Sequence, residues 1–346
     1  MGAQQESDLS GKTRLRKDTL CRHGRLPLET IACDLCGSIR QTVVYQAPDR
    51  RYFPDELFTV VRCDECGLGF LNPRPSFEEM GKYYPPVYYE DEFARNLKYH
   101  QTRYAREARY LREVEERGGS RRLLDVGCAN GDFPRFVAAR GWTVEGVEVS
   151  ASASPVRDFP VYSQPFPEIP PDTPTYDAVT AWAVIEHVHH PKAYFRKAAK
   201  ILKPGGIFVF LVTNFGSLAS RRLFCEDVPR HLFFFTRETV KQYLADAGFR
   251  LEREDNRNDI FSLPPENFLL FLKARVLGKS FCWQDLPPSR PQFIRARGLR
   301  AGLRSSLRFA LAYPLRTVDR VLRPTVERVQ MLRKTYGIST YVARRV

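Results

Sequence analysis

The sequence predicts an α/β fold, because one stretch changes from the periodicity of a strand to that of a helix and back. Residues 122–150 begin with a short apolar run at Leu123, Leu124 and Val126, which is typical of a buried parallel strand. Phe133 and Val137 then recur at helical spacing, and residues 144–149 form a second apolar strand. Strand, helix and strand in this order predict a βαβ unit of a parallel sheet.

The turn inside this unit has the residue types of a nucleoside site. Asp125 ends the first strand, Gly127 and Gly131 follow it, and Glu148 lies near the end of the second strand. Glycines let the backbone approach a ligand, and helix N–H groups face the same crevice. An acidic residue about 20 positions on can accept both ribose hydroxyls. The glycine spacing differs from GxGxxG, which disfavours a pyrophosphate ligand.

The stretch resembles motif I and the ribose-binding acid of class I S-adenosylmethionine (AdoMet) methyltransferases. The resemblance implies a seven-stranded Rossmann-like sheet with AdoMet as cofactor, and Glu148 would hold the ribose hydroxyls. Trp182, in the apolar run of residues 178–184, would either border the cofactor or pack in the core. The residues expected to shape the cofactor turn are Asp125, Gly127, Cys128 and Gly131.

Composition sets the wider expectations. A chain of 346 residues, 43% hydrophobic and 27% charged, allows roughly two globular domains. No apolar run reaches the roughly 18 residues of a membrane span, and the polar start lacks a secretory signal. We therefore expect a cytoplasmic protein with reduced thiols and a disordered segment at residues 1–27.

Two CxxC pairs, each followed by glycine, predict a metal site. Four thiolates at this spacing close a tetrahedral site with no open position, which is typical of structural Zn²⁺. A pair of redox CxxC motifs is the alternative, and the chain lacks the thioredoxin context for it. We expect residues 28–92 to form a zinc ribbon and its connector. The predicted ligands are Cys33, Cys36, Cys63 and Cys66.

The sequence after the second pair strengthens the assignment. The order CxxCG, GLGFLNPRP and YYP resembles a bacterial family that joins an N-terminal zinc ribbon to a class I methyltransferase and is associated with saccharide or glycan modification. The resemblance implies a methyltransferase domain over residues 93–346. An aromatic cluster either lines an acceptor cleft or packs the ribbon on the core; its members are Tyr83, Tyr84, Tyr88, Tyr89 and Phe93.

The remaining elements follow the same fold. An amphipathic helix is expected over residues 97–114, and Thr236 is a suitable N-cap for a later helix. Thr239 occupies the position of a capping-box Glu, which predicts an incomplete box. Further strands are expected at residues 161–164, 178–184, 207–213, 249–255 and 340–343, the last of them antiparallel.

His231 is the candidate catalytic residue. It lies in the loop that usually faces the acceptor in this class, and histidine can take a proton from a hydroxyl near neutral pH. A purely structural histidine is the alternative. The stretch is similar to a run in sugar C-methyltransferases, but Val228 and Arg230 replace their Tyr and Glu, which favours O-methylation. His187, His189 and His190 could bind a metal, but capping and packing roles are favoured for them.

Residues 260–335 are expected to be a helical insertion before the last strand. Residues 290–334 carry 12 Lys or Arg and two acids, a net charge of 12 − 2 = +10. Pro314 and Pro324 should divide the stretch into separate helices. It is either a lid with a solvated basic face or a peripheral contact with anionic membrane. Nucleic-acid binding is disfavoured, because a wide Leu/Val stripe does not suit a phosphate-tracking surface.

These expectations together define one functional hypothesis. The chain would be cytoplasmic, or membrane-associated if the insertion binds lipid, and would transfer methyl from AdoMet to a hydroxyl of a saccharide or lipid-linked saccharide. The alternatives are an RNA methyltransferase and a non-catalytic AdoMet-binding protein.

Overall fold

A computed structural model describes most of the chain. It covers residues 28–49, 51–85, 88, 97–118, 120–150, 158–170, 172–173, 175–217, 227–256, 269, 272–273, 276–278 and 299–346. The predictions for residues 1–27, Tyr89, Phe93 and most of residues 257–298 lie outside the described residues.

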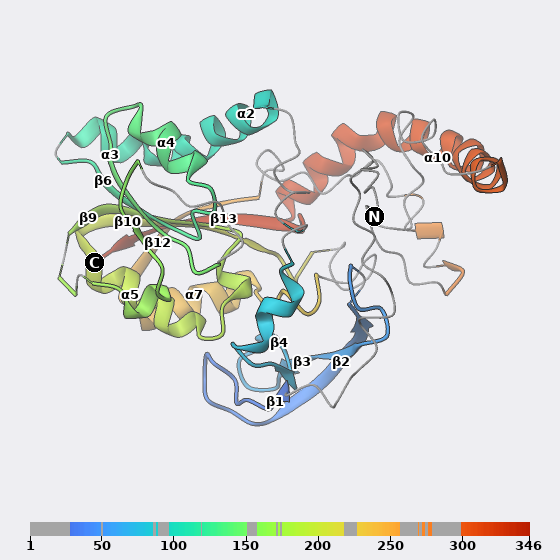
Figure 1. Cartoon of the computed structure of the whole chain (residues 1–346), viewed down its shortest axis with the longest axis horizontal. Helices are drawn as coiled ribbons and strands as arrows, with labels where there is room; N and C mark the ends of the chain where they lie inside the picture. Colours follow the sequence, from blue (N-terminus) through green and yellow to red (C-terminus); the bar gives the residue numbers. More distant parts are fainter. Residues whose placement is uncertain are drawn as a thin grey trace, which may run out of the picture.

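The centre of the fold is a seven-stranded sheet with the strand order β12-β13-β10-β9-β6-β7-β8 (Figure 1). β13 runs antiparallel to β10 and β12, and the other pairs are parallel. This confirms the predicted Rossmann-like sheet with an antiparallel last strand. The strands are β6 (Arg122–Val126), β7 (Thr143–Val147), β8 (Val161–Tyr162), β9 (Tyr176–Trp182), β10 (Leu202–Thr213), β12 (Phe249–Asp255) and β13 (Ile338–Arg345).

Helices cover both faces of this sheet. α2 (Leu97–Ala108), α3 (Arg112–Arg117) and α4 (Asp132–Ala138) lie on one face, and α5 (Pro191–Ile201) and α7 (Arg237–Asp246) lie on the other (Figure 1). The single helix expected over residues 97–114 is instead interrupted by a 3-10 turn at Arg109–Leu111. Leu111 and Val114 remain buried, so the predicted apolar stripe still faces the core.

The capping box of α7 is complete, contrary to the sequence prediction. Thr239 N–H donates to the Thr236 hydroxyl, and the Thr236 N–H donates to the Thr239 hydroxyl at 2.9 Å. The Thr239 hydroxyl therefore does the work of the Glu carboxylate expected at this position. The Thr239 side chain is fully buried.

The N-terminal ribbon is built into the second domain by a shared sheet. β2 (Gln41–Pro48), β3 (Leu57–Cys63) and β4 (Gly69–Leu71) are consecutive antiparallel strands, and β11 (Phe233–Phe234) adds to the edge of β4. A Cβ on Gly69 would lie 2.9 Å from the Phe215 ring, so this approach requires glycine. A short pair, β1 (Leu28–Glu29) and β5 (Arg74–Pro75), lies beside the ribbon sheet.

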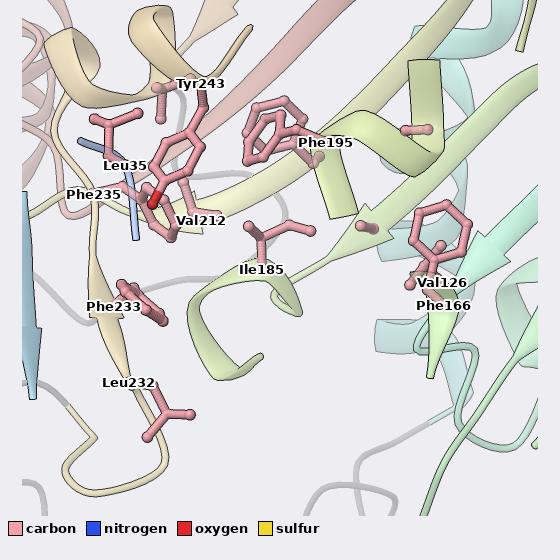
Figure 2. Close-up of a cluster of buried hydrophobic side chains, with 14 of the residues drawn as sticks. Leu35, Val126, Phe166, Ile185, Phe195, Val212, Leu232, Phe233, Phe235 and Tyr243 are labelled. Carbon is pink, nitrogen blue, oxygen red and sulfur yellow. The ribbon is translucent and has the colours of Figure 1, made fainter. Parts of the chain in front are cut away.

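One hydrophobic core joins the ribbon to the sheet. Leu35 of the ribbon lies near Tyr243 of α7, and Phe233 of β11 lies below Phe235 in the same layer (Figure 2). Phe195 of α5 stacks on Tyr243 at a centroid distance of 5.1 Å. The ribbon therefore shares its core with the domain that carries the cofactor turn.

The basic insertion contains one long helix, α10 (Leu299–Leu332), which continues through both prolines. The expectation of separate helices is wrong, because each proline removes only one N–H donor and Leu and Arg around it favour helix. Val321 and Leu332 on α10 are 73% and 84% exposed. In the described part of the chain, we find no helix whose length and apolar character would let it span a bilayer.

Candidate cofactor and acceptor site

The predicted cofactor turn follows β6 and is held by close contacts. Gly127 adopts φ 72° and donates its N–H to the Val147 carbonyl at 2.8 Å. A Cβ at Gly127 would lie 2.5 Å from the Val184 side chain. Gly131 also has a left-handed conformation and is the N-cap residue of α4. Both predicted glycines therefore occupy positions that an L side chain fits poorly.

Glu148 lies against this turn. Its carboxylate accepts N–H bonds from Ala129 at 2.9 Å and from Ser150 at 2.8 Å. Burial raises the pKa of Glu148, and the two backbone bonds oppose that change. Ala129 has φ 48°, which is uncommon for a residue with a Cβ. The predicted ribose-binding acid is therefore fixed beside the glycine turn, and its ribose contact stays a prediction.

Asp125 is buried at the end of β6 and belongs to a larger acidic group. It accepts a 2.6 Å hydrogen bond from the Thr180 hydroxyl of β9. Burial raises the pKa of Asp125 to about 8, the Thr180 bond opposes this, and the Glu107 charge adds to it. Glu107 of α2 is itself buried and paired with Arg103 at 2.8 Å.

Sequence reasoning missed Glu107, although a signal existed. It lies three residues after Tyr104 and four before Leu111, on the apolar stripe of the helix. A charged residue on a buried stripe is costly unless it is paired. Glu107 meets that condition through Arg103, and its charge acts on Asp125 at the end of β6.

Cys128 packs beneath the turn. A Cβ on Gly146 of β7 would lie 2.6 Å from the Cys128 sulfur, so the two residues are in close contact. Burial raises the pKa of the Cys128 thiol. Cys128 therefore packs against β7, and its part in binding the cofactor stays a prediction.

Trp182 ends β9 in an aromatic setting. Its ring makes an edge contact with Phe133 of α4 at 5.5 Å and a tilted contact with Tyr110 at 6.2 Å. Its indole Nε1 is buried and has no hydrogen-bond partner among the described residues. The core-packing interpretation is thus observed, and a border with the cofactor stays a prediction.

The chain then turns directly toward the predicted acceptor side. Ala183 has φ 55°, and the 3-10 helix η5 (Ile185–His187) follows it. Leu232 N–H donates to the Glu186 carbonyl at 2.8 Å, which ties the loop of His231 to η5. The His187 and His231 rings meet edge to face at 4.6 Å.

Glu186, His187 and His231 form a compact group that we call the Glu–His–His cluster. One possible ligand atom from each residue lies within 4.8 Å of the others. His187 Nδ1 also lies 2.8 Å from the Tyr84 hydroxyl and 3.0 Å from the Arg230 carbonyl oxygen.

The described members of the aromatic cluster of the connector lie in two different settings. Tyr84 and Tyr88 lie at the site, with their ring centroids 5.1 Å apart, whereas Tyr83 is fully buried and bonds Glu56. His189 lies outside the Glu–His–His cluster, with Nε2 3.1 Å from the Pro75 carbonyl oxygen.

Arg230 fixes the loop that carries His231. Its buried guanidinium pairs with Asp49 of the ribbon at 3.0 Å and with Asp227 at 2.7 Å. Burial opposes ionisation of Asp227, but the Arg230 charge still holds the pKa of that carboxyl well below its usual range. Arg230 stands where sugar C-methyltransferases carry Glu, and it forms an ion pair with Asp49 of the ribbon.

The four predicted metal-ligating cysteines meet at one end of the ribbon. The Cys33–Cys66 and Cys36–Cys63 sulfur atoms lie 3.4 and 3.5 Å apart, and all four sulfurs lie within 4.8 Å of one another. Bonds of about 2.3 Å to a tetrahedral Zn²⁺ place sulfurs about 3.8 Å apart. The residues therefore fit a zinc ion in spacing and chemistry.

Both CxxC turns have the same backbone geometry. The glycine after each pair has φ 77°, and its N–H donates to the carbonyl of the first cysteine, Gly37 to Cys33 at 2.7 Å and Gly67 to Cys63 at 3.0 Å. Only a residue that tolerates this conformation can close such a turn at low cost.

Comparison with known proteins defines the class of the central domain. Residues 96–254 match a family model described as a methyltransferase domain. Together with the strand order, this shows that the chain contains a class I AdoMet-dependent methyltransferase domain.

Among curated proteins, this region is similar to ubiquinone biosynthesis O-methyltransferases. It is 35% identical over 104 residues to the one from Alkalilimnicola ehrlichii, covering 27% of this chain and 42% of the relative. It is 30% identical over 105 residues to the one from Paracidovorax citrulli, covering 27% and 44%. The matches span less than half the length of these relatives.

Solved structures are more distant. Geranyl diphosphate C-methyltransferase from Streptomyces coelicolor A3(2) is 16% identical, with coverage of 70% of this chain and 79% of that chain and a TM-score of 0.42. A methyltransferase from Mesorhizobium loti is 16% identical, with coverage of 68% and 96% and a TM-score of 0.39. Likeness at this level carries no argument about substrate.

Proposed function

We propose that this protein transfers the methyl group of AdoMet to a hydroxyl oxygen. The observation that carries the proposal is that one segment, Val184 to His187, contacts both the cofactor turn and the loop of His231. Val184 packs on Gly127, and Glu186 and His187 follow within three residues. A cofactor in the glycine turn would therefore lie on the same edge of the sheet as the Glu–His–His cluster.

Methyl transfer to a hydroxyl requires that AdoMet and the acceptor be aligned and that the hydroxyl lose its proton. The sulfonium of AdoMet is already an excellent leaving group, so the protein mainly has to hold the two reactants in line. A hydroxyl must also lose its proton, and His231 is our candidate for the group that takes it. The buried Arg230–Asp49 pair supports this role by holding the loop in place.

Two acceptor classes are supported by different features. The ribbon and the GLGFLNPRP motif resemble a family associated with saccharides, which supports a saccharide or lipid-linked saccharide. The curated relatives are named for ubiquinone biosynthesis, which supports a hydroxyl of a ubiquinone precursor. In both classes, the proposed acceptor atom is a hydroxyl oxygen.

Incubation with radiolabelled AdoMet and cell extract separates these acceptors. Label should enter a saccharide or a lipid fraction, and its rate of incorporation should fall at least tenfold when His231→Ala replaces the intact protein. Label in RNA would instead favour the RNA methyltransferase alternative. Binding of S-adenosylhomocysteine with no labelled product in any fraction would favour a non-catalytic cofactor-binding protein.

We further propose a structural Zn²⁺ at Cys33, Cys36, Cys63 and Cys66. The ion would tie together the two turns of a ribbon that shares its core with the catalytic domain. Asp34, between the first two ligands, accepts hydrogen bonds from the Lys192 N–H at the start of α5 and from the Tyr243 hydroxyl, both at 2.9 Å. The zinc site thus supports the face on which the ribbon docks.

For α10 we propose a peripheral contact with anionic membrane. The 290–334 segment is strongly basic, and its described part exposes large apolar side chains rather than packing them. Apolar exposure bordered by arginine suits an interface of acyl chains and acidic headgroups. Such a contact would bring a lipid-linked acceptor to the site.

A further inference from the structure

We propose that the Glu–His–His cluster is a second metal site, which binds a divalent transition-metal ion at the acceptor side of the domain. The site itself stands on the geometry of Glu186, His187 and His231. Its role in catalysis rests on the proposed methyl transfer. The three residues come from η5 and from the loop before β11, and none of them belongs to the ribbon.

The spacing of the cluster suits one ion. Ligand atoms bound at about 2.1 Å to a common ion lie about 3.0–3.4 Å apart in octahedral or tetrahedral geometry. The three atoms here lie within 4.8 Å of one another, so small side-chain rotations would close the site. The loop of His231 is already tied to η5 by the Leu232–Glu186 backbone bond.

The second contact of His187 prepares its imidazole for a metal. A carbonyl oxygen can only accept, so the 3.0 Å contact with Arg230 implies a proton on His187 Nδ1. Tyr84 shares the same nitrogen at 2.8 Å. In that tautomer Nε2 carries the lone pair. Metal-bound histidines usually donate their other nitrogen to a carbonyl or a carboxylate in this way.

The donor set selects the kind of ion. Two imidazoles and one carboxylate suit zinc, manganese, cobalt or ferrous iron better than calcium or magnesium, which prefer oxygen ligands. Glu186 is 1% exposed, and a cation beside it would offset the cost of burying a carboxylate. Three protein ligands also leave positions open for a substrate oxygen.

A bound ion would change the role of His231 from base to ligand. An acceptor hydroxyl on the open position would lose its proton to water more easily, because a divalent cation stabilises the oxyanion. That oxygen would then form the O–CH₃ bond as the S–CH₃ bond breaks, and the bonding pair would stay on sulfur to give S-adenosylhomocysteine.

The test is a titration of the full-length, zinc-loaded protein with Mn²⁺, followed by electron paramagnetic resonance of free Mn²⁺. Mn²⁺ is a poor ion for four thiolates, so it reports on the nitrogen and oxygen site. The proposal predicts about one Mn²⁺ per chain and at least a tenfold loss of affinity in Glu186→Gln and in His231→Ala. His190→Ala is the matched control, since His190 is exposed and outside the cluster.

Two outcomes would overturn the proposal. The first is the absence of Mn²⁺ binding tighter than about 1 mM to the intact protein, and the second is binding that both cluster variants keep. Each variant is first checked for S-adenosylhomocysteine binding, which reports its fold independently of the metal. Metal binding without cofactor binding would refute the proposed function and leave the metal site standing. The reverse result would refute only the metal site.

Discussion

At the scale of single residues, the site is defined by backbone positions that tolerate little change. Gly127 combines φ 72° with the 2.5 Å approach of Val184, and positive φ also occurs at Ala129 within the turn and at Ala183 just after β9. Strained residues of this kind concentrate where a ligand is bound. Alanine carries no sequence signal for such a role, so these two positions could not be predicted.

Gly127→Ala should abolish cofactor binding or weaken it at least tenfold, because the new methyl group meets both backbone strain and Val184. Calorimetry with S-adenosylhomocysteine measures the effect. Gly205→Ala is the control, since Gly205 has φ 76° but no atom closer than 4.0 Å to an added Cβ. Equal cofactor affinity in the two variants would show that the clash is irrelevant to the site.

The pKa of Asp125 predicts a pH dependence of stability in the cofactor-free protein. Asp125 ionises near pH 3.8 when unfolded and near pH 8 when buried, so the native state binds the extra proton between these values. The free energy of unfolding should therefore fall as pH rises from about 4 to 8. Asp125→Asn should flatten this slope in thermal melts, and an unchanged slope would contradict the assignment.

His231→Ala should lower turnover at least tenfold, the lower range for a lost acid–base group, while S-adenosylhomocysteine still binds. The loss is expected whether His231 acts as base or as metal ligand. His190→Ala should keep full turnover in the same assay. Unchanged turnover in His231→Ala would remove His231 from the mechanism.

At the scale of elements, the sequence predicted most of the fold. Strands β6 and β9 were found because they are buried on both faces and are continuously apolar, and the CxxC spacing located the ribbon turns. The pairing of β4 with β11 was missed, since it joins residues more than 160 positions apart. The continuity of α10 was not predicted, because a proline need not end a helix when residues of high helix propensity flank it on both sides.

The ribbon should hold one tightly bound zinc ion per chain through its thiolates. Elemental analysis should find that ion in the intact protein and in Cys128→Ala, and should find it lost in Cys36→Ala. Cys36 is exposed and leaves no core cavity when truncated, whereas Cys128 is buried elsewhere. Four freely reactive ribbon thiols and no metal would contradict the zinc assignment.

At the scale of the whole molecule, the N-terminal ribbon contributes residues to the site of the methyltransferase domain. The ribbon contributes Asp49 and Tyr84 to the surroundings of the Glu–His–His cluster, so it supports the acceptor side directly. This coupling could not be predicted, because it depends on how the connector packs. The sequence suggested only that its tyrosines either pack or line a cleft; packing is observed for Tyr83, and the cleft stays a prediction.

The membrane proposal for α10 is tested by flotation with anionic liposomes. The intact protein should float with them, and Val321→Glu combined with Leu332→Glu should remain at the bottom, because charge replaces two exposed apolar contacts. Ile39→Glu is the control, since Ile39 is 81% exposed on the ribbon. Absence of the intact protein from the floated fraction would leave α10 as a lid.

The central claim is that the turn after β6, together with Glu148, binds the AdoMet nucleoside. Calorimetry of the intact protein with S-adenosylhomocysteine tests it most directly. We predict one site per chain and at least a tenfold loss of affinity in Glu148→Ala, with no loss in Glu238→Ala on the exposed side of α7. No heat of binding, or equal affinity in Glu148→Ala and the intact protein, would contradict the account.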